Sequence, residues 1–120
     1  MKILIVDDST AMRRIVRRCL RQAGFGNHDV VEAENGAVAL DLVGREQPDL
    51  ILADWNMPEM SGIELLNSLR SKGNTVTFGF ITSEGTDAMR GKASAAGAAF
   101  LLAKPFTPED MASVLKEYIK

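Results

Sequence analysis

The sequence predicts an α/β fold: a five-stranded parallel sheet with helices on both faces. Three observations predict it. Short apolar runs alternate five times with longer segments whose apolar residues recur at helical spacing. The connections are short and carry capping or turn residues. Four of the apolar runs stop at polar side chains, and open parallel sheets place their ligands at the carboxyl ends of strands.

The five strands are expected at residues 2–6, 29–34, 49–53, 76–81 and 99–103. Nearly continuous apolar runs such as 2–6 and 49–53 are typical of strands buried on both faces. The run at 29–34 is more polar, so we expect it at an edge of the sheet. Gly79 interrupts the run at 76–81, which suggests that a neighbouring element approaches the backbone closely there.

The first two helices are expected after Ser9 or Asp8 as a cap and after Asn35-Gly36. Gly24 is a suitable C-terminal stop for the first helix. Apolar residues at helical spacing define the buried side of each helix. In the first they run from Ala11 to Ala23, and in the second the inward residues are Ala37, Leu40 and Val43.

Three further helices follow the later strands. Ser61 and Glu64 match a capping box, so a helix begins there with Ile63, Leu66 and Leu69 inward and Gly73 after it. The helix at 86–96 is rich in alanine and has few large apolar residues, so we expect it to be the least firmly anchored. Thr107-Pro108 begins the last helix, with an inward face of Met111, Val114, Leu115, Tyr118 and Ile119.

Length and composition indicate one domain spanning residues 1–120, with 46% hydrophobic residues. No apolar run is long enough to span a membrane, and the N-terminal run is too short for a signal peptide. The single Cys19 excludes an internal disulfide and suits the cytoplasm. A formal net charge of -2 argues against broad nucleic-acid binding.

Charged and polar side chains follow four of the strands. Asp7 and Asp8 follow the first, Asp54 the third, Thr82 the fourth and Lys104 the fifth. Because parallel strands end at one edge, these residues should converge. Two carboxylates about 4 Å apart repel by roughly 4 kcal/mol at an effective dielectric of about 20, so three clustered acids favour a cation. Hard oxygen ligands suit Mg²⁺, and the set suits a phosphoryl group beside a carboxylate nucleophile.

The chain resembles response-regulator receiver domains over its whole length, and is most similar to the single-domain chemotaxis regulators among them. The motifs that carry the resemblance occur in order and at matching spacing: VDDS at 6–9, DWNMP at 54–58, SG at 61–62, TSE at 82–84 and KPFTPE at 104–109. The resemblance implies the flavodoxin-like strand order 2-1-3-4-5. It also implies a phosphorylation-dependent switch that is not itself an enzyme, although it assists its own phosphorylation and dephosphorylation.

The resemblance further implies roles for individual residues. Asp54 would be the phosphoacceptor. Asp8 and Asp54 would bind Mg²⁺ by their side chains, Asp7 through a water molecule, and Asn56 through its backbone carbonyl. Lys104 would pair with the phosphoryl group.

Other motif residues would act after phosphorylation. The Thr82 hydroxyl would turn towards the phosphate and shift the following loop. Asn56 and Glu84 would tune loss of the phosphate. The Lys104-Pro105 bond is expected to be cis.

One departure concerns the residue three before the lysine. The family usually has Tyr or Phe there as an aromatic switch, and this chain has Leu101. Phe100 cannot replace it, because alternation points consecutive strand residues to opposite faces. Leu101 therefore puts in doubt the coupling to the output face, and with it binding to the flagellar motor switch.

The expected partners are a histidine kinase or histidine phosphotransfer protein and a downstream protein target. No output domain follows, so we expect signalling by protein–protein contact from a monomer. A phosphorelay intermediate and a receiver excised from a larger regulator are alternatives. An aspartate-nucleophile phosphatase would need a second acid two residues after Asp7, where Ser9 stands. A flavin mononucleotide carrier is disfavoured because Asp7 and Asp8 would repel its phosphate.

Two surface features have competing interpretations. The segment after Ser9 carries Arg13, Arg14, Arg17, Arg18 and Arg21. A solvated basic face is narrowly favoured, and docking of an acidic kinase or phosphotransfer surface is the alternative. Trp55 is either an ordinary surface aromatic or, as we interpret it, a partly exposed gate beside Asp54.

Overall fold

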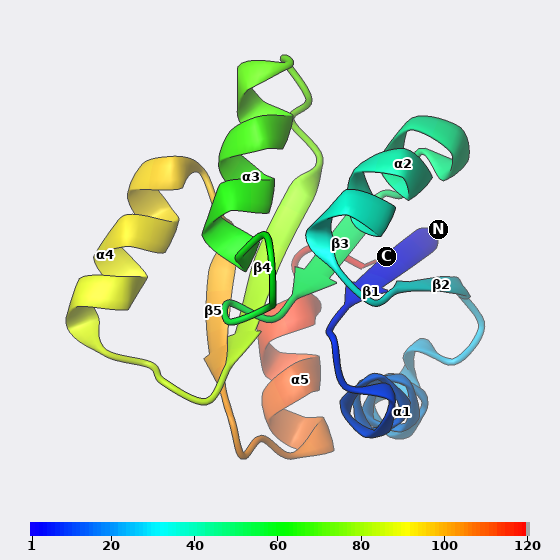
Figure 1. The fold of residues 1–120 in the computed structure, drawn as a ribbon. Helices are drawn as coiled ribbons and strands as arrows, with labels where there is room; N and C mark the ends of the chain where they lie inside the picture. The colour runs from blue at the N-terminus through cyan, green and yellow to red at the C-terminus, as the bar shows by residue number, and fades with distance from the viewer. Residues whose placement is uncertain (120) are drawn as a thin grey trace.

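A computed structural model describes residues 1–119 of the chain. Five parallel strands form one sheet in the order β2-β1-β3-β4-β5, with helices on both faces (Figure 1), so the predicted flavodoxin-like arrangement is confirmed. The strands are β1 (Lys2–Val6), β2 (Asp29–Ala33), β3 (Leu50–Ala53), β4 (Thr77–Thr82) and β5 (Phe100–Ala103). The more polar β2 lies at an edge, as expected.

Each helix begins at a residue whose side chain accepts a backbone N–H, so the helix starts are fixed locally. The N-caps are Ser9, Asn35, Ser61, Thr86 and Thr107, with capping boxes at Ser61 and Thr107. The helices are α1 (Thr10–Leu20), which continues into the π-helical turn η1 (Arg21–Phe25), α2 (Gly36–Glu46), α3 (Gly62–Ser71), α4 (Asp87–Ala96) and α5 (Pro108–Leu115). Within residues 1–119, no helix is both long enough and apolar enough to cross a membrane.

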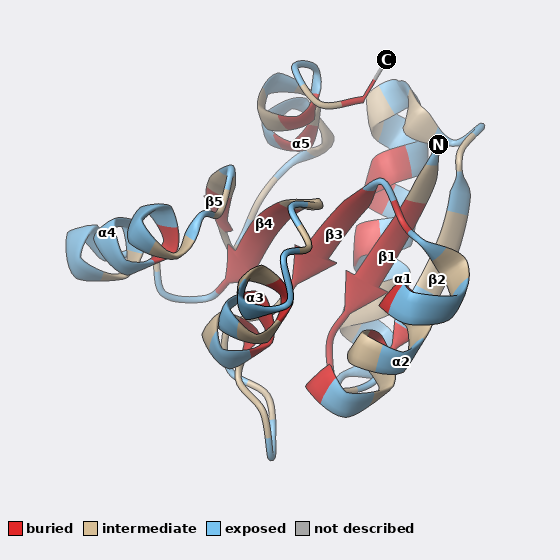
Figure 2. Ribbon diagram, turned by 90° about the horizontal axis from the view of Figure 1, so that it is seen from above, coloured by how far each residue is buried: buried red, intermediate tan, exposed pale blue. Residues whose placement is uncertain are grey.

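The sheet separates two apolar cores (Figure 2). Helices α1 and α5 cover one face, where Ile3, Ile5 and Leu52 are buried. Helices α2, α3 and α4 cover the other, where Phe78 and Phe80 are fully buried. Since β1 and β3 are buried on both faces, the residues that follow them start from the most rigid part of the fold.

Some inward positions differ from the expectation. In α2, Ala37 is exposed and Ala39 is buried, because the helix is rotated so that Gly36, Ala39 and Val43 face the sheet. The last helix ends at Leu115, yet Ile119 beyond it is still buried. Helix α4 buries one side chain, that of Ala93, which agrees with its expected weak anchoring.

The position of Gly79 inside β4 is explained by the neighbouring Phe100. It lies opposite Phe100 in the β4–β5 register, and a Cβ at Gly79 would overlap the Phe100 ring. Phe100 packs on the α1–α5 side of the sheet and stacks with Tyr118 at 5.4 Å between ring centroids. Leu101 packs on the opposite side, so the predicted alternation of these two residues is confirmed.

We predict that Gly79→Ala lowers the free energy of unfolding by about 2 kcal/mol, the usual scale of overpacking. In a Phe100→Ala background the same substitution should cost much less, because the ring that blocks the new methyl group is gone. Urea unfolding of the four variants measures the coupling. Gly91→Ala in α4, where a Cβ meets open space, is the control and should be neutral or stabilising. An equal cost in both backgrounds would contradict the assignment.

Candidate functional site

The register of the central strands brings the acidic residues together. Val6 at the end of β1 lies opposite Ala53 at the end of β3. The next residues are Asp7 and Asp54, and the backbone N–H of Asp54 donates to the Val6 carbonyl at 2.9 Å. The two carboxylates therefore leave adjacent strands at the same level.

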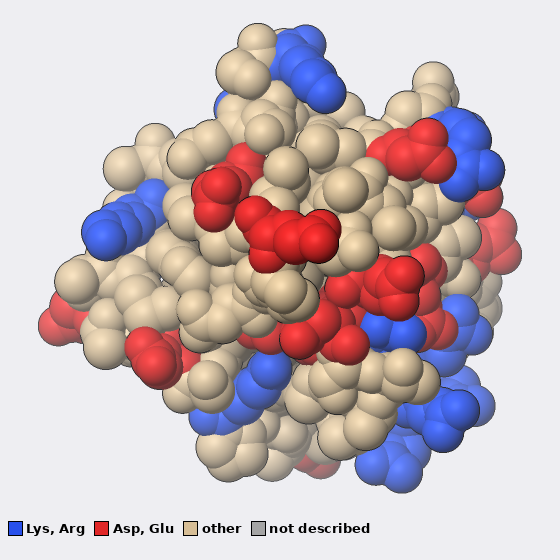
Figure 3. Space-filling view, in the orientation of Figure 1, with Lys and Arg blue, Asp and Glu red and all other residues tan. Residues whose placement is uncertain are grey.

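Three carboxylates meet at this edge. Asp7, Asp8 and Asp54 each offer one oxygen, and these oxygens all lie within 4.8 Å of one another. Asp7 is buried at 4% exposure, Asp54 is half-buried and Asp8 is exposed. The predicted convergence of these acids is confirmed. In the orientation of Figure 1, Figure 3 shows acidic side chains gathered near the centre of the view.

Lys104 is the counter-charge of the cluster. Its Nζ lies 3.7 Å from Asp7 Oδ2 and 3.7 Å from Asp54 Oδ1. Burial raises the pKa of both carboxyls above the ordinary range, and Lys104 opposes that rise in each. Three carboxylates against one ammonium leave an excess of two negative charges, which matches a divalent cation.

Thr82 and Asn56, two further motif residues, differ in burial and in their hydrogen bonds. Thr82 is fully buried, and its Oγ1 accepts the Glu84 N–H at 3.3 Å. Its carbonyl accepts the Lys104 N–H at 2.7 Å. Among the described residues no hydrogen bond joins Thr82 to Asp54. Asn56 is exposed in the loop after Asp54.

Two sequence expectations about the loops around the site are also met. The Lys104-Pro105 bond is cis. Trp55 is half-buried and packs on Phe80, with 4.6 Å between ring centroids. The indole therefore lies next to Asp54 in the chain and against the core beneath it, and it is partly exposed as expected; its role as a gate stays a prediction.

Helix α3 begins in close contact with the site. The Gly62 N–H donates to the Trp55 carbonyl at 2.8 Å, and a Cβ at Gly62 would overlap the Asp54 carbonyl oxygen. Glycine is needed at this position because of the close backbone approach. The SG motif thus fixes the backbone after Asp54.

The basic residues of α1 do not share one environment. Arg13 turns inward whereas Arg17 stays exposed, and both contact the Glu32 carboxylate, at 2.9 and 3.3 Å. Arg14 and Arg18 are exposed. The solvated-face interpretation is therefore wrong for Arg13, whose side chain is 14% exposed. The sequence signal for this shared contact was the spacing of four residues, which places Arg13 and Arg17 on the same side of the helix.

An apolar groove of about 480 Å³ adjoins Lys104. Met12 and Ile15 of α1 line one side, and Pro105 and Phe106 line the other. Ile15 is 41% exposed, although its helical spacing had suggested a buried residue. The groove therefore presents apolar surface directly beside the acidic cluster.

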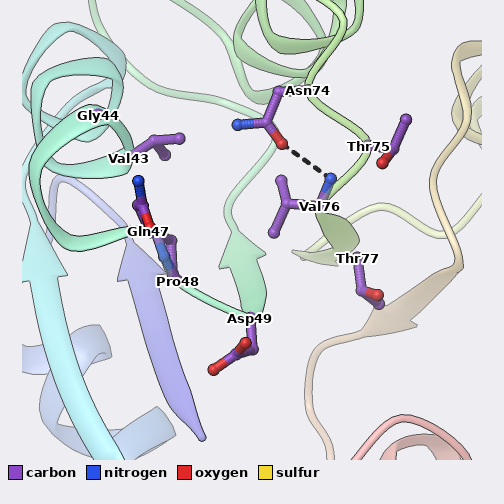
Figure 4. A pocket seen from close by; sticks show the side chains of 9 residues that line it. All are labelled: Val43, Gly44, Gln47, Pro48, Asp49, Asn74, Thr75, Val76 and Thr77. Atoms are coloured by element: carbon purple, nitrogen blue, oxygen red, sulfur yellow. Dashed lines mark hydrogen bonds between the residues drawn. The ribbon is translucent and has the colours of Figure 1, made fainter.

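A further cavity lies at the opposite edge of the sheet (Figure 4). It measures about 560 Å³ and is lined by the segments that lead into β3 and β4, including Gln47, Asp49 and Asn74. Asn74 Oδ1 accepts the Val76 N–H at 2.9 Å there. None of the predicted site residues lines this cavity, so it is separate from the acidic cluster.

The acidic cluster is suited to two kinds of chemistry. Carboxylate oxygens are the ligands that hard divalent cations prefer. A half-buried carboxylate with an ammonium group close by can act as a nucleophile towards phosphorus while the ammonium stabilises the phosphoryl charge. The arrangement therefore fits phosphoryl transfer to a carboxylate.

Comparison with known proteins agrees with this chemistry. Chemotaxis protein CheY homolog of Campylobacter jejuni is 42% identical, covering all of this chain and 90% of its own. Chemotaxis protein CheY1 of Helicobacter pylori is 40% identical, covering all of this chain and 94% of its own. The solved structure of Vibrio cholerae chemotaxis protein CheY4 has a TM-score of 0.86 at 32% identity, covering 98% of this chain and 97% of that one. Residues 3–116 match the response regulator receiver domain. The chain therefore belongs to the response regulator receiver domain family and is a phosphorylation-dependent signalling switch.

Proposed function

We propose that Asp54 accepts a phosphoryl group from a histidine kinase or a histidine phosphotransfer protein. The observation that carries this proposal is the trio of carboxylate oxygens within 4.8 Å, with Lys104 Nζ 3.7 Å from two of them. An Asp54 oxygen attacks the phosphorus of the donor phosphohistidine. A P–O bond forms, the P–N bond breaks, and the imidazole leaves with the bonding electron pair.

The site residues share the work of this transfer. Side chains of Asp8 and Asp54 and the Asn56 carbonyl would hold Mg²⁺, with Asp7 acting through water. When bound, the ion would offset the negative charge of the phosphoryl oxygens. Lys104 adds a cation that can pair with the phosphoryl group. Asn56 and Glu84 flank the site on two loops, where they would tune loss of the phosphate.

The signal would leave through the surface of α4, β5 and α5, with the Thr82 hydroxyl turning towards the new phosphate. The relatives named chemotaxis proteins support a role in chemotaxis. The flagellar motor switch would then be one candidate target, and Leu101 weighs against it. The single buried Cys19 fits a reducing cytoplasm. A phosphorelay intermediate is the second candidate. It is favoured by Leu101, because passing on a phosphoryl group needs no aromatic switch.

The phosphodonor would dock over the groove formed by Met12, Ile15 and Phe106. Apolar surface there adjoins Lys104, so a partner seated on it faces the acidic cluster. Exposed Arg14 and Arg18 on α1 would attract an acidic rim on that partner. Basic side chains of the α1 region are visible at the lower right of Figure 3.

We predict that Mg²⁺ alone changes the fluorescence of the single Trp55, and that Asp54→Ala weakens this response. Lys104→Met should tighten Mg²⁺ binding, because it removes a competing cation. Binding should weaken as the pH falls below neutrality, since burial raises the pKa of Asp7 and Asp54 and protonation of either removes a negative ligand. Fluorescence titration measures all three, and calorimetry that detects no Mg²⁺ uptake by the folded protein would overturn the assignment.

We predict that acetyl phosphate with Mg²⁺ adds one phosphoryl group and that Asp54→Asn accepts none at that position, because the amide is not a nucleophile. Intact-protein mass spectrometry and labelling with radioactive phosphate report the product. Lys104→Met should slow labelling by roughly 10-fold or more, although it tightens Mg²⁺ binding. Normal labelling of Asp54→Asn would refute the proposed acceptor, and normal labelling and signalling of Lys104→Met would refute the role of the lysine.

We predict that reversing the charge of Arg14 and Arg18 to Glu slows phosphotransfer from a phosphorylated histidine phosphotransfer protein by roughly 10-fold, because association loses its electrostatic attraction. Transfer from acetyl phosphate should be unchanged. Arg45→Glu, an exposed position in α2, is the control and should leave both rates near those of the original chain. Equal loss with both donors would show that the substitutions act on the site itself.

A further inference from the structure

Arg13 connects the acidic cluster to the neighbouring elements through its guanidinium. Nη1 donates to the backbone carbonyl of Asp7 at 2.6 Å, Nε donates to Glu32 Oε1 at 2.9 Å, and Nη2 donates to Thr10 Oγ1 at 3.2 Å. The Arg13 side chain is 14% exposed. One side chain therefore ties α1 to β2 and to the loop that carries the first two acids.

The contact matters because the direction of the Asp7 carboxylate depends on that loop. Asp7 Oδ1 accepts the Ser9 N–H at 2.9 Å, and the Asp7 N–H donates to the Ala33 carbonyl at 3.1 Å. These contacts leave Asp7 Oδ2 on the side of Lys104. The Asp7 carbonyl is held by Arg13, so the peptide plane between Asp7 and Asp8 is fixed by a side-chain contact that lies outside the site.

We propose that Arg13 is a positioning residue for the cation site, acting through the Asp7 carbonyl to set the directions of Asp7 and Asp8. This inference rests on the proposed function, because it assumes that the cluster binds Mg²⁺. Glu32 contacts both Arg13 and Arg17 and offsets the charge of Arg13 near the cluster. The positioning role and simple electrostatics predict opposite changes in Mg²⁺ affinity when Arg13 is replaced. Loss of positioning weakens Mg²⁺ binding, whereas loss of a nearby positive charge strengthens it.

Arg17→Ala provides a matched control for Arg13→Ala. Arg17 lies one turn further along α1 and contacts the same Glu32, but its Nη2 donates to the Val30 carbonyl instead of the Asp7 carbonyl. Both substitutions remove one positive charge and one contact to Glu32. Only Arg13→Ala also removes the hydrogen bond to the Asp7 carbonyl, which holds the loop that carries Asp7 and Asp8.

The test is Mg²⁺ affinity measured by Trp55 fluorescence and by calorimetry. We expect Arg13→Ala to weaken binding about 10-fold, the scale typical of groups that orient metal ligands, and Arg17→Ala to change it by less than about 2-fold. Arg13→Lys keeps the charge but not the fork of donors, so an intermediate loss would report positioning alone. Urea unfolding in a chelator should show similar stability for Arg13→Ala and Arg17→Ala.

The outcomes separate this inference from the proposed function. Absence of Mg²⁺ binding in the original chain would overturn the proposed function. If the original chain binds and Arg13→Ala binds equally or more tightly, the positioning role is wrong. Equal weakening by Arg13→Ala and Arg17→Ala would also contradict it, because the effect would then come from general loosening of α1. If Arg13→Ala does not fold, unchanged binding by Arg13→Lys overturns it.

Discussion

Repulsion between like charges is the constraint on which the rest of this structure depends. Oxygens of Asp7, Asp8 and Asp54 lie within 4.8 Å of one another, where the carboxylates repel one another unless a cation offsets their charge. Lys104 offsets part of this cost. The backbone holds the acids in place all the same, as the Ser9 N–H on Asp7 Oδ1 illustrates. The chain thus keeps a charge imbalance that a divalent ion and a phosphoryl group can relieve.

The sheet makes such an arrangement possible because its central strands resist displacement. The strands β1 and β3 are flanked by pairing on both sides and by apolar cores on both faces. The helices proposed to meet partners leave more of their surface exposed. Helix α4 buries only Ala93 among its own residues, and α1 leaves Ile15 exposed beside the apolar groove. Well-held acids beside a weakly anchored α4 are what a two-state signalling surface requires.

The strand ends could be predicted from sequence because each apolar run stops abruptly at a polar residue. Parallel pairing then forces Asp7, Asp54 and Lys104 to one edge whatever the details of packing. The helix starts were equally clear, since caps act within a few residues. What sequence could not show is how a helix is rotated on its axis. The inward turn of Arg13, the exposure of Ile15 and the burial of Ala39 instead of Ala37 all depend on that rotation.

The aromatic ring of β5 stands at position 100 and not at position 101, so it lies on the α5 side of the sheet and Leu101 lies on the α4 side. Phe100 fills the space over Gly79 and stacks with Tyr118, so the ring ties β5 to the α5 side. On the α4 side, Arg90 Nη1 donates to the Leu101 carbonyl at 3.1 Å. Since α4 has little apolar anchoring, this polar contact has a larger share in holding the helix against β5 than it would beside a packed ring. Unlike a packed ring, this hydrogen bond can exchange partners without opening a cavity in the core.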